Sequence, residues 1–180
     1  FVFDADVKDV KSGISLHAHL PLAWAAAHTF PQPLVAEWMH GNLVCLQALA
    51  ALESHEKEFD ASATGEHAAG RLEAKVDLLL QLVGELMRKQ QPSLPSVEVV
   101  LGAHEMIWEA AAPIAAGSEG VLTLFLSPRL HWPLTLPVQI TGAQGTKVHA
   151  KLIHLSEDVQ EWLERTLFRY HRRALQARAR

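Results

Sequence analysis

Eleven histidines and a single cysteine are the side chains of this 180-residue chain best suited to bind a metal or attack a substrate. His17 and His19 lie two residues apart, so on a strand they share one face, a spacing that allows chelation. His149 and His154 lie five apart and would point to opposite faces of a strand, and the first pair has no identifiable third ligand. We interpret these histidines as solvent-facing strand residues, and we predict no metal site and no bound cofactor.

Cys45 is the cysteine, and it lies in a stretch with the three-and-four spacing of an amphipathic helix. On the apolar face of such a helix a thiol behaves as a small buried hydrophobe rather than as a nucleophile. The sequence contains no Gly-x-x-x-x-Gly-Lys loop, Gly-x-Ser-x-Gly elbow or His-Glu-x-x-His helix. It therefore predicts a non-enzymatic protein, with an enzyme of unrecognised site as the less favoured alternative.

A run of arginines near the C-terminal end could, taken alone, bind nucleic acid or phospholipid. Acidic residues from Glu157 to Glu164 precede it, an order that complements the dipole of a helix. We interpret the run as the solvated face of a helix, and we expect Trp162, Phe168 and Tyr170 to pack on the rest of the fold. The arginines are Arg165, Arg169, Arg172, Arg173, Arg178 and Arg180.

The composition is that of a globular protein and argues against a nucleic-acid-coating, disulfide-linked or membrane-spanning chain. Hydrophobic residues make up 49% of the chain and charged residues 20%, which is ample material for a core. A net charge of −4 argues against a protein that coats nucleic acid. One cysteine excludes an internal disulfide and fits a reducing compartment, and no apolar run reaches the roughly 18 residues of a membrane span. We expect a cytoplasmic globular protein.

Six segments have the patterns of β-strands. Apolar side chains alternate with polar ones in residues 13–24, which predicts a half-buried strand with Ile14, Leu16, Ala18 and Leu20 on its buried face. Turn residues separate five further β-rich runs, at the spacing of a small antiparallel barrel or sandwich. The first strand can join this barrel; the alternative is a separate N-terminal helical domain. The later strands are predicted at Val97–Leu101, Met106–Ala110, Gly120–Ser127, Leu134–Thr141 and Lys147–Leu155.

Two long helices are predicted over residues 34–59 and 66–90, and prolines follow the second. A last helix begins after Ser156, a favourable N-cap residue. The predicted fold class is α+β: a small antiparallel β-barrel with two long helices and a C-terminal helix. We divide the chain into residues 1–33 with the first barrel strand, 34–91 as an inserted helical pair, and 96–180 as the barrel and C-terminal helix.

The second long helix carries an apolar seam with heptad spacing and no charge at its a or d positions. Leu78, Leu82 and Met87 spread the apolar surface over more of the circumference than one neighbouring helix covers. A monomer could bury the seam against its own first helix and the barrel. We expect instead a homo-tetramer built on this helix, with a dimer as the alternative. The predicted interface residues are Leu72, Val76, Leu79, Leu80, Val83 and Leu86.

The last third of the chain resembles the PilZ domain, a bacterial module best known for binding cyclic di-GMP. Residues 97–117, with Pro113 before Gly117, resemble the family's second and third strands, and residues 121–140 resemble the paired strands that follow. Residues 151–173 are similar to the closing strand and acid-led helix, which ends in a phenylalanine-x-x-x-arginine-arginine run. The resemblance implies a small β-barrel, to which residues 13–24 would supply the first strand.

The motifs with which the PilZ family binds the dinucleotide are missing. Its receptors use an Arg-x-x-x-Arg pair before the first strand and an Asp/Asn-x-Ser-x-x-Gly turn after the second, because guanidinium groups bind phosphate and guanine bidentately. No arginine precedes Gly13, and the Asp, Ser and Gly positions of the turn read Val100, Gly102 and Glu105. Glu105 would place a carboxylate beside the ligand's phosphates. We predict that cyclic di-GMP is not bound.

The resemblance, without these motifs, implies a degenerate PilZ protein that works as an adaptor or assembly module through protein contacts. It further implies a role in type IV pilus, motility or virulence signalling, with an unidentified protein partner. From the net charge we expect no nucleic acid as a partner. The alternative is a cyclic di-GMP receptor with atypical contacts, for example from the arginines at 165–173.

Overall fold

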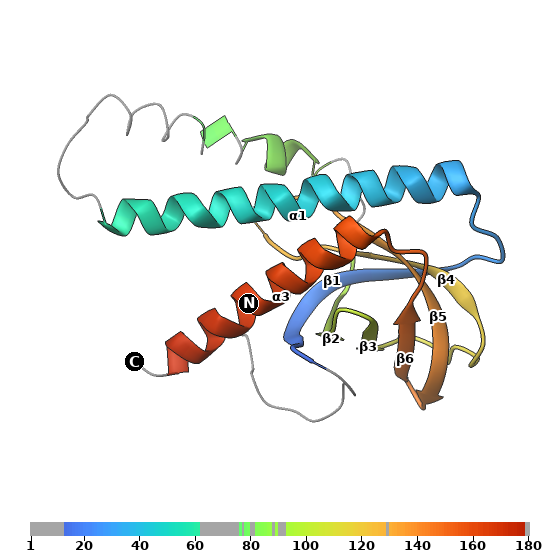
Figure 1. Cartoon of the computed structure of the whole chain (residues 1–180). Coiled ribbons are helices and arrows are strands. Elements are labelled where there is room, and N and C mark those ends of the chain that lie inside the picture. Colours follow the sequence, from blue (N-terminus) through green and yellow to red (C-terminus); the bar gives the residue numbers. More distant parts are fainter. Residues whose placement is uncertain are drawn as a thin grey trace.

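The computed structural model describes residues 13–61, 76, 78–79, 82–87, 89, 93–128 and 130–178. Six strands form a closed antiparallel barrel in the order β1-β2-β3-β6-β5-β4, and two helices lie across one side of it (Figure 1). The strands are β1 Leu16–Ala26, β2 Ser96–Leu101, β3 Glu105–Glu109, β4 Glu119–Leu124, β5 Leu134–Gln144 and β6 Lys147–Leu152. The helices are α1 Gln32–Ala61 and α3 Glu157–Arg178, and residues 82–87 are also helical.

The predicted α+β class is confirmed, and the N-terminal strand is part of the barrel rather than of a separate domain. The predicted strands all occur, with ends that differ by a few residues. α3 begins as predicted, because the Val159 N–H donates to the Ser156 hydroxyl over 3.3 Å. Within the described residues, no helix is long and apolar enough to cross a membrane.

Strand β1 closes the barrel because it pairs with two different strands along its length. Its first part, from Leu16 to Pro21, pairs with β2, and its second part, from Leu22 to Ala26, pairs with β4. Pro21 lies where the partner changes, a place at which a residue without an N–H is tolerated. Its carbonyl accepts a 3.2 Å hydrogen bond from the Phe125 N–H. The strand therefore continues through a proline and ends two residues later than predicted.

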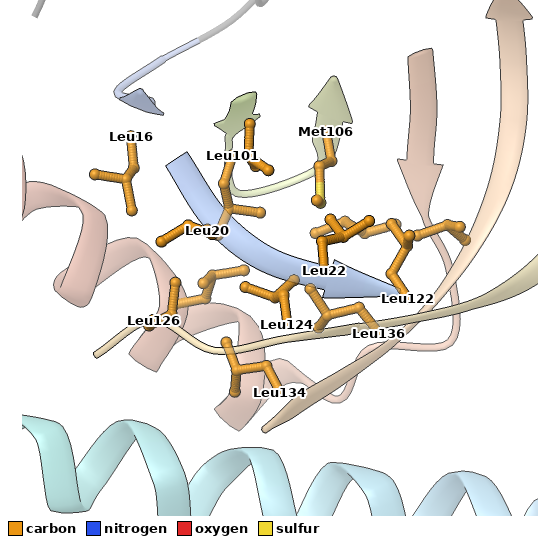
Figure 2. Packing of buried hydrophobic residues seen from close by; sticks show 14 of the residues in the cluster. Leu16, Leu20, Leu22, Leu101, Met106, Leu122, Leu124, Leu126, Leu134 and Leu136 are labelled. Atoms are coloured by element: carbon orange, nitrogen blue, oxygen red, sulfur yellow. The ribbon is translucent and has the colours of Figure 1, made fainter. Parts of the chain in front are cut away.

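The barrel interior is filled by aliphatic side chains (Figure 2). On β1 the residues Leu16, Ala18 and Leu20 are buried in strict alternation, as predicted. Leu22 continues this face, and Ile14 ahead of the strand is only half-buried. Each buried leucine stabilises the fold by roughly 1.5–3 kcal/mol. The labelled residues that meet them in Figure 2 are Leu101, Met106, Leu122, Leu124, Leu126, Leu134 and Leu136.

The first half of α1 belongs to the same core. Its buried face contains one polar residue, Asn42, which is 1% exposed. The Asn42 Nδ2 donates to the Thr135 carbonyl, and the Thr135 N–H donates to Asn42 Oδ1, both over 2.8 Å. The pairing between β5 and β6 begins only at Val138, so Thr135 has no partner strand on that side. The Asn42 amide takes the place of the missing strand and pairs with the N–H and the C=O of Thr135. The apolar members of this helix face are Val35, Met39, Cys45, Leu46 and Leu49.

Replacing Asn42 by alanine should destabilise the whole domain, because it leaves the N–H and the C=O of Thr135 without a partner. Unsatisfied buried groups cost about 1–3 kcal/mol each, so we expect the free energy of unfolding to fall by about 2–4 kcal/mol. Urea titration followed by circular dichroism measures this. Gln47→Ala, at an exposed position of the same helix, is the matched control. Equal unfolding free energies for the two variants would contradict the assignment.

Candidate functional site

The β2–β3 turn is the place where the PilZ resemblance puts the dinucleotide, and the three predicted positions lie together there. Val100 is buried in β2, and the Gly102 N–H donates to the Glu105 carbonyl over 2.9 Å to close the turn. Glu105 is half-buried at the start of β3 and lies opposite Lys151 of β6 in the sheet register. An apolar side chain, a glycine and a carboxylate thus occupy the positions to which the resemblance assigns Asp or Asn, Ser and Gly.

Helix α3 packs over this turn. The His104 ring lies 3.0 Å from Gln160 Nε2 through its Nδ1 atom, and its Nε2 atom is 3.9 Å from the Glu164 carboxylate. The carbonyl of His104 accepts a 2.8 Å hydrogen bond from the Leu152 N–H, which ties the turn to the end of β6. The helix therefore covers one side of the turn and brings Glu164 as a second carboxylate to it.

A groove of about 690 Å³, here called the α3 groove, opens between the start of the described chain, the β2–β3 turn and α3. Its walls combine apolar side chains with two arginines. Phe168 stands at its edge with 52% of its surface exposed. One carboxylate, that of Glu164, also lines it. The residues that line the groove are Gly13, Ile14, Ala103, His104, Glu164, Arg165, Leu167, Phe168 and Arg169.

The prediction that Phe168 packs on the rest of the fold is wrong. Leu167 and Tyr170 are buried and occupy the inner face of α3, so helical geometry turns Phe168 outward. Trp162 is half-buried against the core and Tyr170 is buried, as predicted for both.

The Glu53 carboxylate joins α1 to α3, and sequence reasoning missed it. One oxygen lies 3.2 Å from Arg169 Nε and the other 3.2 Å from Arg173 Nη1, while the Glu53 side chain is only 12% exposed. The Tyr170 hydroxyl hydrogen-bonds to the same carboxylate. Burial, and then the negative charge of Glu53, raise the pKa of Tyr170, so the hydroxyl stays protonated and can donate.

The arginine run is therefore not a single solvated face. Arg169 and Arg173 are partly covered and engage α1, which corrects the prediction for these two. Arg165 is exposed, as predicted; it pairs with Glu161 one turn earlier and lies over the Trp162 ring, 5.4 Å from its centroid. The spacing of Arg169 and Arg173, four residues apart, was the available signal that both could reach one partner.

The histidines are placed differently from one another. His17 is half-buried beside the Ser15 hydroxyl at 3.2 Å, and His19 is exposed. His149 lies in β6, but His154 follows the strand in a left-handed conformation with φ of 56°, so the two do not share a strand as expected. Among the described residues, no group of three His, Cys, Asp or Glu side chains could hold a metal ion.

Cys45 is a buried hydrophobe, as predicted, with 1% of its surface exposed. Burial raises the pKa of its thiol to about 12, and Sγ lies 3.5 Å from the Trp132 carbonyl, to which it donates. At neutral pH such a thiol is protonated and is not a nucleophile.

The predicted oligomer interface is only partly described. Leu72 and Leu80 lie outside the described residues. Val76, Leu79, Val83 and Leu86 are described, and all four are exposed in the single chain.

A closed six-stranded antiparallel barrel, whose last strand leads into an acid-led helix over the β2–β3 turn, is a PilZ-like fold. Residues 43–180 match the family described as "Atypical PilZ domain, cyclic di-GMP receptor", and the chain belongs to this family. A search of the curated proteins gave no match.

A solved structure shares the fold. It is the crystal structure of a pathogenic protein from Xanthomonas campestris, described as a new tetrameric PilZ domain self-assembled via an unusual helical bundle. The two sequences are 23% identical, the alignment covers 93% of each chain, and the TM-score is 0.73.

The buried thiol leads to a test of reactivity and pH dependence. We expect Cys45 to resist Ellman's reagent in the native protein at neutral pH and to react fully in guanidinium chloride. The pKa of the Cys45 thiol is raised from 9.0 to about 12 on folding, because burial disfavours the thiolate. The contribution of the protonated thiol to the free energy of unfolding is therefore fully present below pH 9 and is lost as pH rises towards 12. The unfolding free energy of wild type, relative to that of Cys45→Ala, should decline across this range. Rapid labelling of the native protein would contradict the placement.

Proposed function

We propose that the protein is a non-enzymatic PilZ adaptor that assembles into a homo-tetramer through its second long helix and acts in the cytoplasm on a protein partner. The observation that carries this proposal is a cluster of six large apolar side chains, each 46% to 60% exposed in the single chain. Apolar clusters of this kind mark interaction surfaces. The cluster consists of Val76, Leu78, Leu79, Leu82, Val83 and Leu86.

The positions of these residues favour more than two helices in the assembly. Val76, Leu79, Val83 and Leu86 follow the a and d positions of a heptad, which one partner helix would cover. Leu82 falls at a g position beside the seam and is 55% exposed, so a wider interface is needed to bury it. The self-assembly described for the Xanthomonas campestris protein supports the same arrangement here.

In this proposal self-association belongs to the second helix of the inserted pair, and the division of the chain into residues 1–33, 34–91 and 96–180 stays a prediction. The role in type IV pilus, motility or virulence signalling rests on the resemblance to PilZ proteins alone.

The oligomeric state is tested by light scattering coupled to size exclusion. We expect a mass near 80 kDa, four times the 19.9 kDa of the chain. Leu79→Glu/Val83→Glu places charges in the seam and should dissociate the assembly without changing the β signal in circular dichroism. Leu34→Glu/Leu175→Glu adds the same charges at exposed leucines elsewhere and should keep the wild-type mass. A wild-type mass near 20 kDa at micromolar concentration would overturn the assembly.

The proposal includes the absence of cyclic di-GMP binding. Glu105 and Glu164 both lie at the turn where the family's ligand would place its phosphates, and like charges repel. The arginines that line the α3 groove already have acidic partners, Glu161 for Arg165 and Glu53 for Arg169. A dinucleotide would have to compete with these pairs.

A second candidate function, a cyclic di-GMP receptor with atypical contacts, is favoured by two observations. The family is described as a cyclic di-GMP receptor. The α3 groove, moreover, combines Arg165 and Arg169 with the exposed ring of Phe168, a set able to hold phosphate and to stack on a base.

Isothermal titration calorimetry with cyclic di-GMP separates the two functions. A micromolar affinity corresponds to about 8 kcal/mol, and each missing charge-assisted hydrogen bond removes about 1.5–3 kcal/mol of it. We therefore expect no saturable heat at about 100 micromolar ligand. A dissociation constant below about 10 micromolar, lost in Arg165→Gln, would favour the receptor.

A further inference from the structure

We propose that the outer face of α3 docks an acidic segment of the partner protein, which places an apolar side chain against Phe168. The proposal rests on the adaptor function and names the chemistry of its partner. The docking face is defined as Phe168, Arg172 and Leu175 together with the adjoining α3 groove.

The docking face is apolar where a solvated helix face would be polar. Phe168 is 52% exposed and Leu175 is 50% exposed, and they lie two helical turns apart on one side of α3. Arg172 lies between them on the same side and is exposed. Leu167 and Ala174, by contrast, are buried, so the outward position of the two large apolar residues is fixed by the packing of the helix.

Two hollows adjoin along this face. Phe168 and Arg169 line the α3 groove of about 690 Å³, and they also line a smaller hollow of about 40 Å³ with Arg172, Arg173 and Gln176. The two hollows therefore meet at Phe168 and Arg169, and the second follows α3 as far as Gln176, towards the end of the helix that reaches beyond the barrel (Figure 1). Residues 164–176 of a helix span about 18 Å, the length of roughly five or six residues of extended peptide.

Charge selects an acidic occupant. From Arg165 to Gln176 the helix contains four arginines and no acidic residue, although the whole chain carries a net charge of −4. Glu53 is shared by Arg169 and Arg173, and Glu161 faces Arg165. Among the described residues Arg172 has no acidic partner within ion-pair distance. Glu164 lies at the barrel end of the groove, 3.9 Å from the His104 ring, so the positive part of the face is its distal part.

The mixture of side chains favours a peptide over a nucleotide or a lipid surface. The Leu175 side chain has no polar group that could recognise a base, and it has no planar ring that could stack on one. Two exposed apolar residues, about 10 Å apart, are too few to anchor a helix in a bilayer, but they match side chains spaced along a peptide. An exposed arginine between two apolar contacts is also a frequent centre of protein interfaces.

The test selects peptides from a random phage-display library on the immobilised wild-type protein and measures the enriched peptides by fluorescence anisotropy. We expect acidic sequences with at least one large apolar residue, bound more weakly as salt concentration rises. Phe168→Ala/Arg172→Glu should weaken binding at least about tenfold, since it removes the apolar contact and reverses a charge. Leu34→Ala/Lys147→Glu makes the same changes at exposed positions, one near the start of α1 and one at the end of β6 that is remote from α3, and should bind like wild type.

Failure of the docking face and failure of the assembly give different results. Peptide binding should persist in Leu79→Glu/Val83→Glu, and Phe168→Ala/Arg172→Glu should keep the wild-type mass in light scattering. The docking proposal is overturned if acidic peptides are not enriched, or if they bind Phe168→Ala/Arg172→Glu as well as wild type. It is also overturned if that variant loses binding to phosphatidylglycerol vesicles or to cyclic di-GMP while acidic peptides bind neither protein.

Discussion

Two hydrogen bonds between the Asn42 side chain and the main chain of Thr135 fix the place where α1 crosses the barrel. Asn42 holds the main chain of Thr135 at the part of β5 that β6 leaves unpaired, and no apolar residue could take its place there. Glu53 lies eleven residues further along the same helix, about 16 Å away, where it meets Arg169 and Arg173. This contact joins α1 to α3, while the buried Leu163 and Leu167 determine which side of α3 faces the core. The buried amide and the carboxylate thus attach the same helix to two different parts of the fold.

Three surfaces of the chain are then available for three tasks. The β2–β3 turn, which the PilZ resemblance associates with a dinucleotide, is covered by α3 and carries carboxylates. The outer side of α3 is basic and apolar, and the residues between 76 and 86 present a leucine-rich cluster of their own. In the proposed function the outer side of α3 binds the partner and the residues between 76 and 86 form the assembly, so the two contacts use separate surfaces.

Local patterns were enough to predict the elements, because period-2 alternation and helix capping act over a few residues. The alternation in β1 and the cap at Ser156 are of this kind, and so is the apolar helix position of Cys45. Contacts between distant residues leave no such pattern. Asn42 reads as one polar residue in an amphipathic series, and nothing near it indicates Thr135, 93 positions away. Phe168 was misplaced for the same reason, since its direction depends on which side of α3 packs against α1.

The double pairing of β1 has a consequence for the order of folding. Its partners lie about 85 and 100 residues further along the chain, at Leu101 and Leu124. The entropy lost in closing these long loops therefore opposes the pairing of β1 more than that of the local hairpins. The β2–β3 and β5–β6 hairpins and α1 are local and can form without it. During synthesis Leu16, Ala18 and Leu20 of β1 therefore remain without a partner strand until β2 has left the ribosome, and Leu22 remains so until β4 has. The strand that is made first thus waits longest for a partner.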